Sequence, residues 1–198
     1  PTGGSVLDTG STFTTPVLYG NTIYYAEAQS GGPVQFVGPV DNAFGAGVYA
    51  AYDYYMIFDV LASSMTLQGV YVYPETAGNV ILYVADNAGT ILKTITYPVT
   101  TGGVKTYIPI DYNFHAGTNY RIGYNSTSGG VAMYRNSAGA SYPYTLANIV
   151  SITGNSFNNA AYYYYFYDWK VGSGSCPSHR VPVTAMITGQ PNVDAGLI

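Results

Sequence analysis

The stretch Cys176-Pro-Ser-His-Arg-Val-Pro-Val-Thr-Ala-Met-Ile187 decides how this chain is organised. From Arg180 to Thr188 apolar and polar residues alternate, which predicts one β-strand. Its apolar face would carry Val181, Val183, Ala185 and Ile187. Pro182 cannot donate a hydrogen bond to a neighbouring strand, so we expect this strand at the edge of a sheet. Cys176 is the only cysteine, and we expect its partner to lie outside these 198 residues.

The best partner for this strand lies near the other end of the chain. Ser11-Thr-Phe-Thr-Thr-Pro16 and Thr22-Ile-Tyr-Tyr-Ala-Glu-Ala28 are typical of two short strands. Tyr19-Gly-Asn21 provides the turn between them. We therefore predict that the two ends of the chain pair with each other in one sheet.

Two breaks in composition divide the chain, one at Gly31-Gly-Pro33 and one at Gly172-Ser-Gly-Ser-Cys176. The segment between them has the length of an ordinary domain, and such a domain can be inserted into a surface hairpin of another. The predicted organisation is a first domain formed by residues 1–30 and 172–190, a second domain formed by residues 31–171, and a linker or the start of a next module at residues 191–198.

The composition is that of an extracellular β-protein. Hydrophobic residues make up 47% of the chain and charged residues only 8%, while Tyr contributes 23 residues and Gly 24. Charged residues are therefore about a third as frequent as usual. A net charge of −4 with six scattered Lys and Arg argues against nucleic-acid binding. No apolar run approaches the length that would span a bilayer.

Segments with period-two alternation recur between turn signals, and no segment keeps a helical period, so the chain is predicted to be all-β. The Asp86-Asn-Ala-Gly89 stretch predicts a hairpin turn, in which Asn87 and Gly89 can take positive φ. The expected strands, enough for a two-sheet sandwich, are Tyr54–Leu61, Met65–Tyr73, Asn79–Ala85, Ile91–Tyr97, Val104–Ile110, Asn119–Tyr124, Val131–Arg135, Asn148–Thr153 and Ala161–Val171.

The outer segments resemble immunoglobulin-like modules of very large bacterial cell-surface proteins that use the type IX secretion route. The residues that carry this resemblance are Gly10-Ser-Thr-Phe-Thr-Thr-Pro16, Thr22-Ile-Tyr-Tyr-Ala-Glu-Ala28 and Cys176-Pro-Ser-His-Arg-Val-Pro-Val-Thr-Ala185. The resemblance implies that they are the late strands E, F and G. It also implies that Cys176 forms a disulfide with a cysteine in the earlier strands, outside this chain.

The middle span is similar to a jelly-roll-type domain that accompanies these modules. The matching stretches are Gly38-Pro-Val-Asp-Asn42, Val70-Tyr-Val-Tyr-Pro74, Gly78-Asn-Val80, Asp86-Asn-Ala-Gly-Thr90, Tyr134-Arg-Asn-Ser-Ala-Gly139, Ser141-Tyr-Pro-Tyr144 and Tyr163-Tyr-Tyr-Phe-Tyr-Asp-Trp169. The expected fold is a jelly-roll-like β-sandwich inserted into the F–G loop of a partial immunoglobulin-like domain. Such modules occur in adhesins, surface fibres and enzyme appendages.

No catalytic motif stands out. The two histidines, His115 and His179, lack partners at a metal-ligand spacing, and no nucleophile elbow, phosphate loop or dinucleotide fingerprint occurs. No two carboxylates are distinguished by their spacing, so we expect no enzyme activity. No cofactor is expected beyond a structural calcium, for which the candidate oxygen ligands are Asp41, Asp53, Asp59, Asp86 and Asp168.

Aromatic residues form the strongest local anomaly, in Tyr162-Tyr-Tyr-Tyr-Phe-Tyr-Asp-Trp169. In one strand, Tyr163, Tyr165 and Tyr167 would share a face, with the intervening rings on the other. Our interpretation is that both rows are covered, one by the opposite sheet and one by the immunoglobulin-like strands. The alternative is that one row is exposed and stacks on sugars.

A second candidate for ligand binding is the loop that carries Arg135, Asn136, Tyr142 and Tyr144, where directional hydrogen-bonding groups lie beside tyrosines. The alternative is that Arg135 ties this loop to the end of the sandwich. The candidate ligand-binding set is therefore Arg135, Asn136, Tyr142, Tyr144, Tyr163, Tyr165 and Trp169.

The predicted role is non-enzymatic, as a structural or adhesive module in a stalk or filament of a secreted or cell-surface protein. The expected partners are neighbouring modules of the same parent chain, or identical subunits that supply strands, and surface glycans. The alternative function is that of a carbohydrate-binding module with exposed aromatics.

Overall fold

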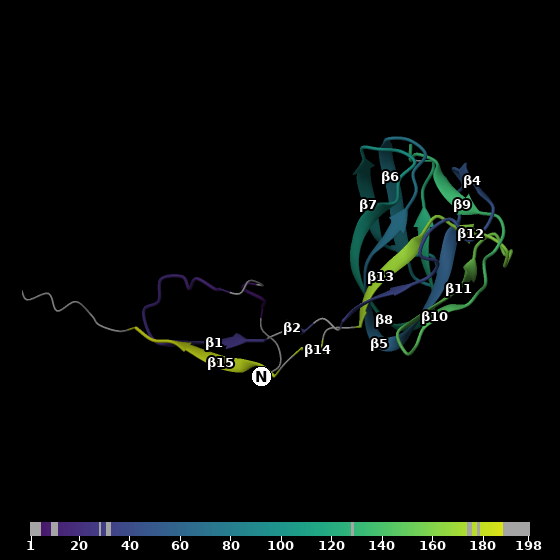
Figure 1. The fold of residues 1–198 in the computed structure, drawn as a ribbon. Coiled ribbons are helices and arrows are strands. Elements are labelled where there is room, and N and C mark those ends of the chain that lie inside the picture. Colours follow the sequence, from purple (N-terminus) through teal and green to yellow (C-terminus); the bar gives the residue numbers. More distant parts are fainter. Residues whose placement is uncertain are drawn as a thin grey trace, which may run out of the picture. The chain divides into compact units, whose positions relative to one another are not determined.

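The computed structural model describes residues 5–8, 12–27, 29–30, 33–127, 129–173, 176–177 and 179–187 (Figure 1). Within these residues the chain is all-β, without helices, and every strand pairing is antiparallel. The chain divides into two compact units, Pro1–Ser30 with Cys176–Ile198 (unit 1) and Gly31–Ser175 (unit 2). Residues 191–198, for which we predicted a linker or the start of another module, lie outside the described residues.

Unit 1 is built on a two-stranded ribbon. The strand β1 (Thr22–Ala26) pairs with β15 (Val181–Ala185), which confirms the predicted pairing of the two chain ends. A shorter pair joins β2 (Gln29–Ser30) to β14 (Cys176–Pro177).

The expected additional strand at Ser11–Pro16 was wrong, since residues 12–16 form no strand. Instead, the Phe13 ring packs edge-on against Tyr24, with 5.2 Å between the ring centroids. The segment therefore packs on β1 through the Phe13 side chain and does not pair with it as a strand.

Unit 2 is a sandwich-like arrangement of two antiparallel sheets. The larger has eight strands, with the order β10-β11-β5-β8-β6-β7 and with β13 pairing with both β5 and β3. The smaller has the order β12-β9-β4. The strands are β3 (Val34–Val37), β4 (Gly47–Ala50), β5 (Tyr55–Val72), β6 (Gly78–Ala85), β7 (Ile91–Val99), β8 (Thr106–Tyr124), β9 (Met133–Asn136), β10 (Tyr144–Leu146), β11 (Val150–Asn155), β12 (Tyr163–Tyr164) and β13 (Tyr167–Ser173).

The two longest strands, β5 and β8, correct the prediction of four shorter ones. Each was expected to break in the middle, but β5 and β8 pair along their lengths, with register shifts. Asp111 and Asn119 take positive φ inside β8, of 46° and 59°. The polar residues that suggested turns are therefore accommodated as β-bulges, which bend a strand without ending it.

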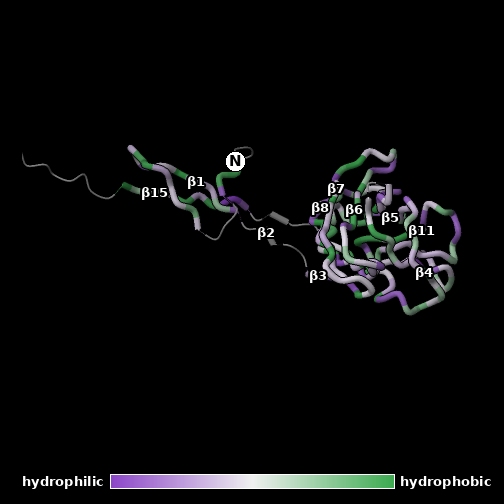
Figure 2. Tube along the Cα trace, turned by 90° about the horizontal axis from the view of Figure 1, so that it is seen from above, coloured by the Kyte–Doolittle hydropathy of each residue, from purple (hydrophilic) through white to green (hydrophobic). Residues whose placement is uncertain are grey.

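The core of unit 2 lies between its sheets and is rich in aromatic rings. Figure 2 shows hydrophilic stretches along the outer loops and hydrophobic residues along the strands between them. The largest fully buried side chains are Trp169, Tyr124, Tyr163, Tyr164, Tyr165, Tyr167, Phe58, Phe114, Phe166, Met56, Met65 and Leu67.

The segment 162–169 is not one strand with two faces, as we had expected. Tyr165, with a φ of 62°, lies between β12 and β13, and Asp168, with a φ of 46°, lies inside β13. The alternation of faces is thereby lost, and residues 163–167 are all buried. The rings that cover them belong to unit 2, not to immunoglobulin-like strands: Phe44, Tyr142 and Tyr144 contact Tyr163, while Tyr54 and Phe157 contact Tyr164.

Burial of these phenols predicts loss of stability in alkaline solution. Desolvation raises the pKa of Tyr124 and Tyr164 from 10.0 to about 12, and raises the pKa of Tyr165 and Tyr167 further. Below pH 10 these groups are neutral in both states, whereas between pH 10 and about 12 they ionise only when the chain unfolds. The free energy of unfolding is therefore expected to fall as the pH rises above 10.

A near-ultraviolet absorbance titration checks this expectation. Part of the absorbance change from tyrosine ionisation should occur only at the pH where the protein unfolds. In denaturant, all the phenols should ionise near pH 10. A folded protein whose tyrosines all titrate as they do in denaturant would contradict it.

Candidate functional site

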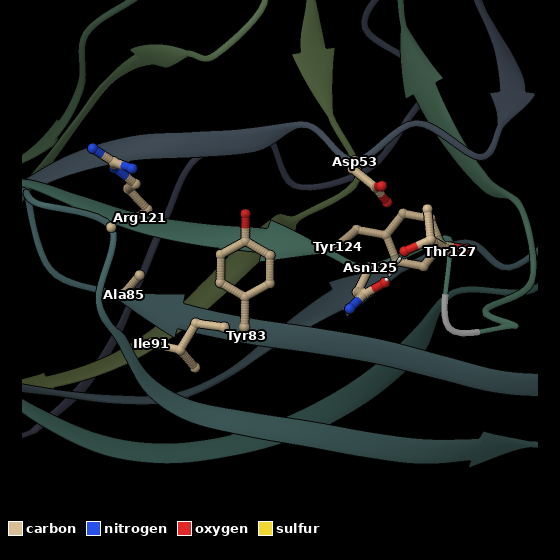
Figure 3. Close-up of a pocket in the computed structure, with 9 residues that line it drawn as sticks. Asp53, Tyr83, Ala85, Ile91, Arg121, Tyr124, Asn125 and Thr127 are labelled. Atoms are coloured by element: carbon tan, nitrogen blue, oxygen red, sulfur yellow. Dashed lines mark hydrogen bonds between the residues drawn. The ribbon is translucent and has the colours of Figure 1, made fainter.

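A shallow pocket of about 280 Å³ opens on unit 2, beside β6 and the end of β8 (Figure 3). The strands contribute side chains from their ends, and the remaining residues come from the turn after β6 and from the loops that flank β5 and β8. Its lining residues are Asp53, Tyr83, Ala85, Gly89, Ile91, Arg121, Tyr124, Asn125 and Thr127.

Tyr83 lies across β8 because the residue opposite it is a glycine. Tyr83 pairs with Gly123, and a Cβ on Gly123 would lie 2.1 Å from Cζ of the Tyr83 ring. Figure 3 shows this ring between Arg121 on one side and Asp53 and Thr127 on the other. The Tyr83 hydroxyl makes no hydrogen bond within the described residues, and partial burial raises its pKa. It is thus a polar group available to a ligand.

Arg121 forms one end of the pocket and is fixed there by two contacts. Its Nη2 donates to the carbonyl oxygen of Asn87 at 2.6 Å, and its guanidinium lies 5.0 Å from the centre of the Tyr55 ring. The predicted turn at Asp86–Gly89 brings Asn87 to this place. Gly89 has a φ of 93°, as expected, whereas Asn87 does not take positive φ.

Asp53 forms the opposite end of the pocket. Its Oδ1 accepts hydrogen bonds from the Ser126 backbone N–H at 2.6 Å and from the Ser126 hydroxyl at 2.7 Å. Beside it, the Thr127 hydroxyl donates to Oδ1 of Asn125 at 3.0 Å. These bonds fix Asp53 and leave its second oxygen without a donor among the described residues.

The loop that carries Asp53 is held by Tyr165, one of the predicted site residues. The Tyr165 hydroxyl donates to the Tyr52 carbonyl at 3.0 Å and accepts from the Tyr52 N–H at 3.1 Å. The Tyr165 ring packs edge-on against Tyr124 with 5.3 Å between centroids. Tyr165 therefore supports the pocket from the core and does not line it.

The structure brings Tyr142, Tyr144 and Tyr163 together, as a cluster of rings in the interior. Tyr142 stacks on Tyr163 at a centroid distance of 6.0 Å, and Tyr144 meets both rings edge-on. The Tyr142 hydroxyl donates to the Tyr162 carbonyl at 2.8 Å. Tyr142 and Tyr144 are half-buried, whereas Tyr163 is fully buried and presents no open face for stacking on a sugar.

Arg135 packs over an aromatic ring, and part of its guanidinium forms no hydrogen bond. Its guanidinium lies 4.8 Å from the centre of the Tyr162 ring. The Nε and Nη1 atoms are buried without a hydrogen-bond partner. Its contact with Tyr162 is a cation–π interaction between β9 and the segment that precedes β12.

Asn136 and Trp169 are core residues. Asn136 is fully buried, and its Nδ2 donates to the carbonyls of Asn42 and Gly45 at 3.0 and 2.7 Å. Its Oδ1 accepts from the Tyr167 hydroxyl at 2.8 Å. Trp169 is also fully buried. Both are therefore out of reach of a ligand in this structure.

We predict that Asn136→Ala lowers the free energy of unfolding of unit 2 by about 3 kcal/mol, because it removes the donor of two carbonyls and the closer acceptor of the Tyr167 hydroxyl. Chemical denaturation followed by circular dichroism measures this change. Asn113→Ala is the matched control, since exposed Asn113 makes a single side-chain hydrogen bond to Thr66. Its effect should stay within about 0.5 kcal/mol. Equal effects of the two substitutions would contradict a buried hydrogen-bonding role for Asn136.

Each of the candidate calcium ligands has a hydrogen-bond or ion-pair partner within the protein. Their respective partners are the Ala43 N–H for Asp41, Ser126 for Asp53, the Asn119 N–H for Asp59, the Thr90 N–H for Asp86 and Lys105 for Asp168. Within the described part of the chain, no three His, Cys, Asp or Glu residues gather where they could hold a metal ion.

Sequence reasoning missed the pocket because its residues come from five separate segments. The available signal was Gly123, a glycine inside a strand pattern, which marks a close approach of another group.

The disulfide that we predicted for Cys176 depends on a side chain that lies outside the described part of the structure. Within the described residues, no helix is long and apolar enough to cross a membrane. No protein family, curated protein or solved structure with which the chain was compared matches it.

Proposed function

We propose that this chain is a non-enzymatic structural and adhesive module of a large secreted or cell-surface protein. The finer architecture that accompanies this proposal is a jelly-roll-like sandwich, unit 2, inserted into the F–G loop of a partial immunoglobulin-like domain, unit 1. The observation that supports it most is the exposure of apolar side chains on both faces of the β1–β15 ribbon.

The register of the ribbon sets which residues share a face. Tyr24 lies opposite Val183 and Ala26 opposite Val181, so these four share one face. Apart from the contact between Phe13 and Tyr24, this face is open: Val181 is 58% exposed and Val183 51%. The other face carries exposed Ile23 and Tyr25. Figure 2 shows hydrophobic residues along both strands.

Two strands alone bury too little apolar surface to be stable in water. An ion pair lies at one end of the ribbon, where Arg180 Nε is 2.7 Å from Glu27 Oε2. We infer that further strands complete this sheet, supplied either by a neighbouring module of the same parent chain or by an identical subunit. Chained sandwiches of this kind would form a stalk or filament at the cell surface.

Amide hydrogen exchange together with sedimentation tests this proposal on the chain itself. Supply by an identical subunit predicts association that depends on concentration and protects the amides of β1 and β15. Supply by a neighbouring module predicts a monomer in which these amides exchange rapidly while those of unit 2 are protected. A monomer with a well-protected ribbon would overturn the proposal, because the ribbon would then need no additional strand.

The matched variants are Val183→Asp, on the open face of the ribbon, and Val104→Asp, at a similarly exposed valine of unit 2. If identical subunits supply the strands, Val183→Asp should abolish association, since a carboxylate cannot be buried there without a partner. Val104→Asp should leave association unchanged. Association that survives Val183→Asp would contradict this route.

Carbohydrate binding through Tyr162–Trp169 receives no support from the geometry, because residues 163–167 and Trp169 are buried. An adhesive role therefore needs another surface for recognition.

A further inference from the structure

We propose that the pocket between Arg121 and Asp53 binds a single neutral pyranose unit, either as a free sugar or as part of a longer glycan. This inference gives a ligand to the adhesive part of the proposed function. It does not depend on how the β1–β15 ribbon is completed, so the two proposals can fail separately.

The size and openness of the pocket favour a small unit at the surface. A volume of about 280 Å³ lies just below the usual range of ligand sites, which begins at about 300 Å³. It lies on unit 2 beside the ends of strands, and Asp53 and Thr127 on its rim are exposed. A sugar ring could therefore enter while the rest of a glycan chain remained in solvent.

The polar groups match the edge of a sugar ring. Arg121 offers donors at one end, and the free oxygen of Asp53 offers an acceptor at the other. Between them, the Tyr83 hydroxyl can donate or accept, and it has no partner among the described residues. Sugar hydroxyls both donate and accept, so they are suited to pair with each of these groups.

These groups are held in place before a ligand arrives. Arg121 is fixed through Asn87 and Tyr55, and Asp53 through Ser126. Each contact uses only some of the hydrogen-bonding atoms of the charged group. Preorganisation of this kind reduces the entropy cost of binding.

The apolar wall suits the CH face of a sugar. The Tyr83 ring and the Ile91 side chain, which is 59% exposed, line the same pocket. Asp53 would repel an anionic ligand at its end of the pocket, and Arg121 would repel a cationic ligand at the other end. We therefore assign a neutral sugar rather than a charged one.

Titration of the isotope-labelled chain with neutral hexoses, N-acetylglucosamine and glucuronic acid, followed by NMR, tests the proposal. Millimolar or tighter binding of at least one neutral sugar is expected, with chemical-shift changes at the amides of Gly89, Arg121 and Thr127. The proposal would be overturned if none of the neutral sugars saturated the site in the millimolar range. Stronger binding of glucuronic acid than of every neutral sugar would overturn the assignment of a neutral ligand.

Two conservative variants locate the site. Tyr83→Phe removes only the hydroxyl, and Asp53→Asn keeps Oδ1 for its bonds from Ser126; each should weaken binding about 3- to 10-fold, as expected for one lost hydrogen bond. Tyr112→Phe makes the same change as Tyr83→Phe on a half-buried tyrosine of β8 that does not line the pocket, and should bind as the unaltered chain does. Binding that is unchanged in both pocket variants would overturn the location.

Unfolding temperatures of the same variants separate binding from folding. Tyr83→Phe and Asp53→Asn should bind less tightly even at temperatures where both are fully folded. Loss of binding in proportion to loss of folded protein would also overturn the assignment, since these residues would then act only on stability.

Discussion

Trp169→Ala is expected to lower the free energy of unfolding of unit 2 by about 3–5 kcal/mol, the largest effect of any single substitution that we predict. Trp169 is fully buried in β13, and its ring meets Phe58 edge-on with 5.2 Å between the centroids. Its Nε1–H donates to the Phe166 carbonyl at 2.7 Å. The substitution opens a cavity between the sheets and leaves that carbonyl without its donor.

Chemical denaturation followed by circular dichroism measures this effect, because the substitution removes the only tryptophan and with it the usual fluorescence signal. Leu61→Ala provides the control, since Leu61 on β5 is 50% exposed. Its cost should be well below that of Trp169→Ala. If the two costs were alike, the placement of Trp169 in a closely packed core would be wrong.

Gly69→Ala should destabilise unit 2 by about 1–3 kcal/mol through overpacking. Gly69 is buried in β5 at a register shift between β5 and β8. A Cβ at this position would lie 2.4 Å from the Ile108 carbonyl oxygen and 2.6 Å from Cζ of the Tyr107 ring. The ring can move, but the carbonyl belongs to the neighbouring strand, so the sheet itself must shift.

Gly154→Ala is the matched control, because a Cβ on this glycine in β11 meets no atom within 4 Å. Alanine there should be neutral or stabilising by up to about 1 kcal/mol, since it has less backbone freedom to lose on folding. Thermal and chemical unfolding, monitored by Trp169 fluorescence, report on both variants. A Gly69→Ala protein as stable as the Gly154→Ala protein would show that the two strands do not approach as closely as described.

The tyrosines over glycines show why the pocket could not be found from the sequence. Tyr83 crosses Gly123, and in the same way Tyr107 approaches Gly69 and Tyr134 approaches Gly47. Each glycine is remote in sequence from its tyrosine or lies on a different strand. A glycine in a strand pattern signals that something comes close, but only the strand order identifies the group.

The sequence alone determined the all-β class, the hairpin turn at Asp86–Gly89 and the pairing of Thr22–Ala26 with Val181–Ala185. These follow from local physical chemistry: side chains alternate along a strand, and glycine tolerates positive φ. Only the tertiary structure decided that residues 163–167 are buried on all sides and that Asp53, Tyr83 and Arg121 share a pocket. The reason is that burial and proximity depend on how distant segments pack, and on positive φ at Tyr165 and Asp168, which no local pattern of residues required.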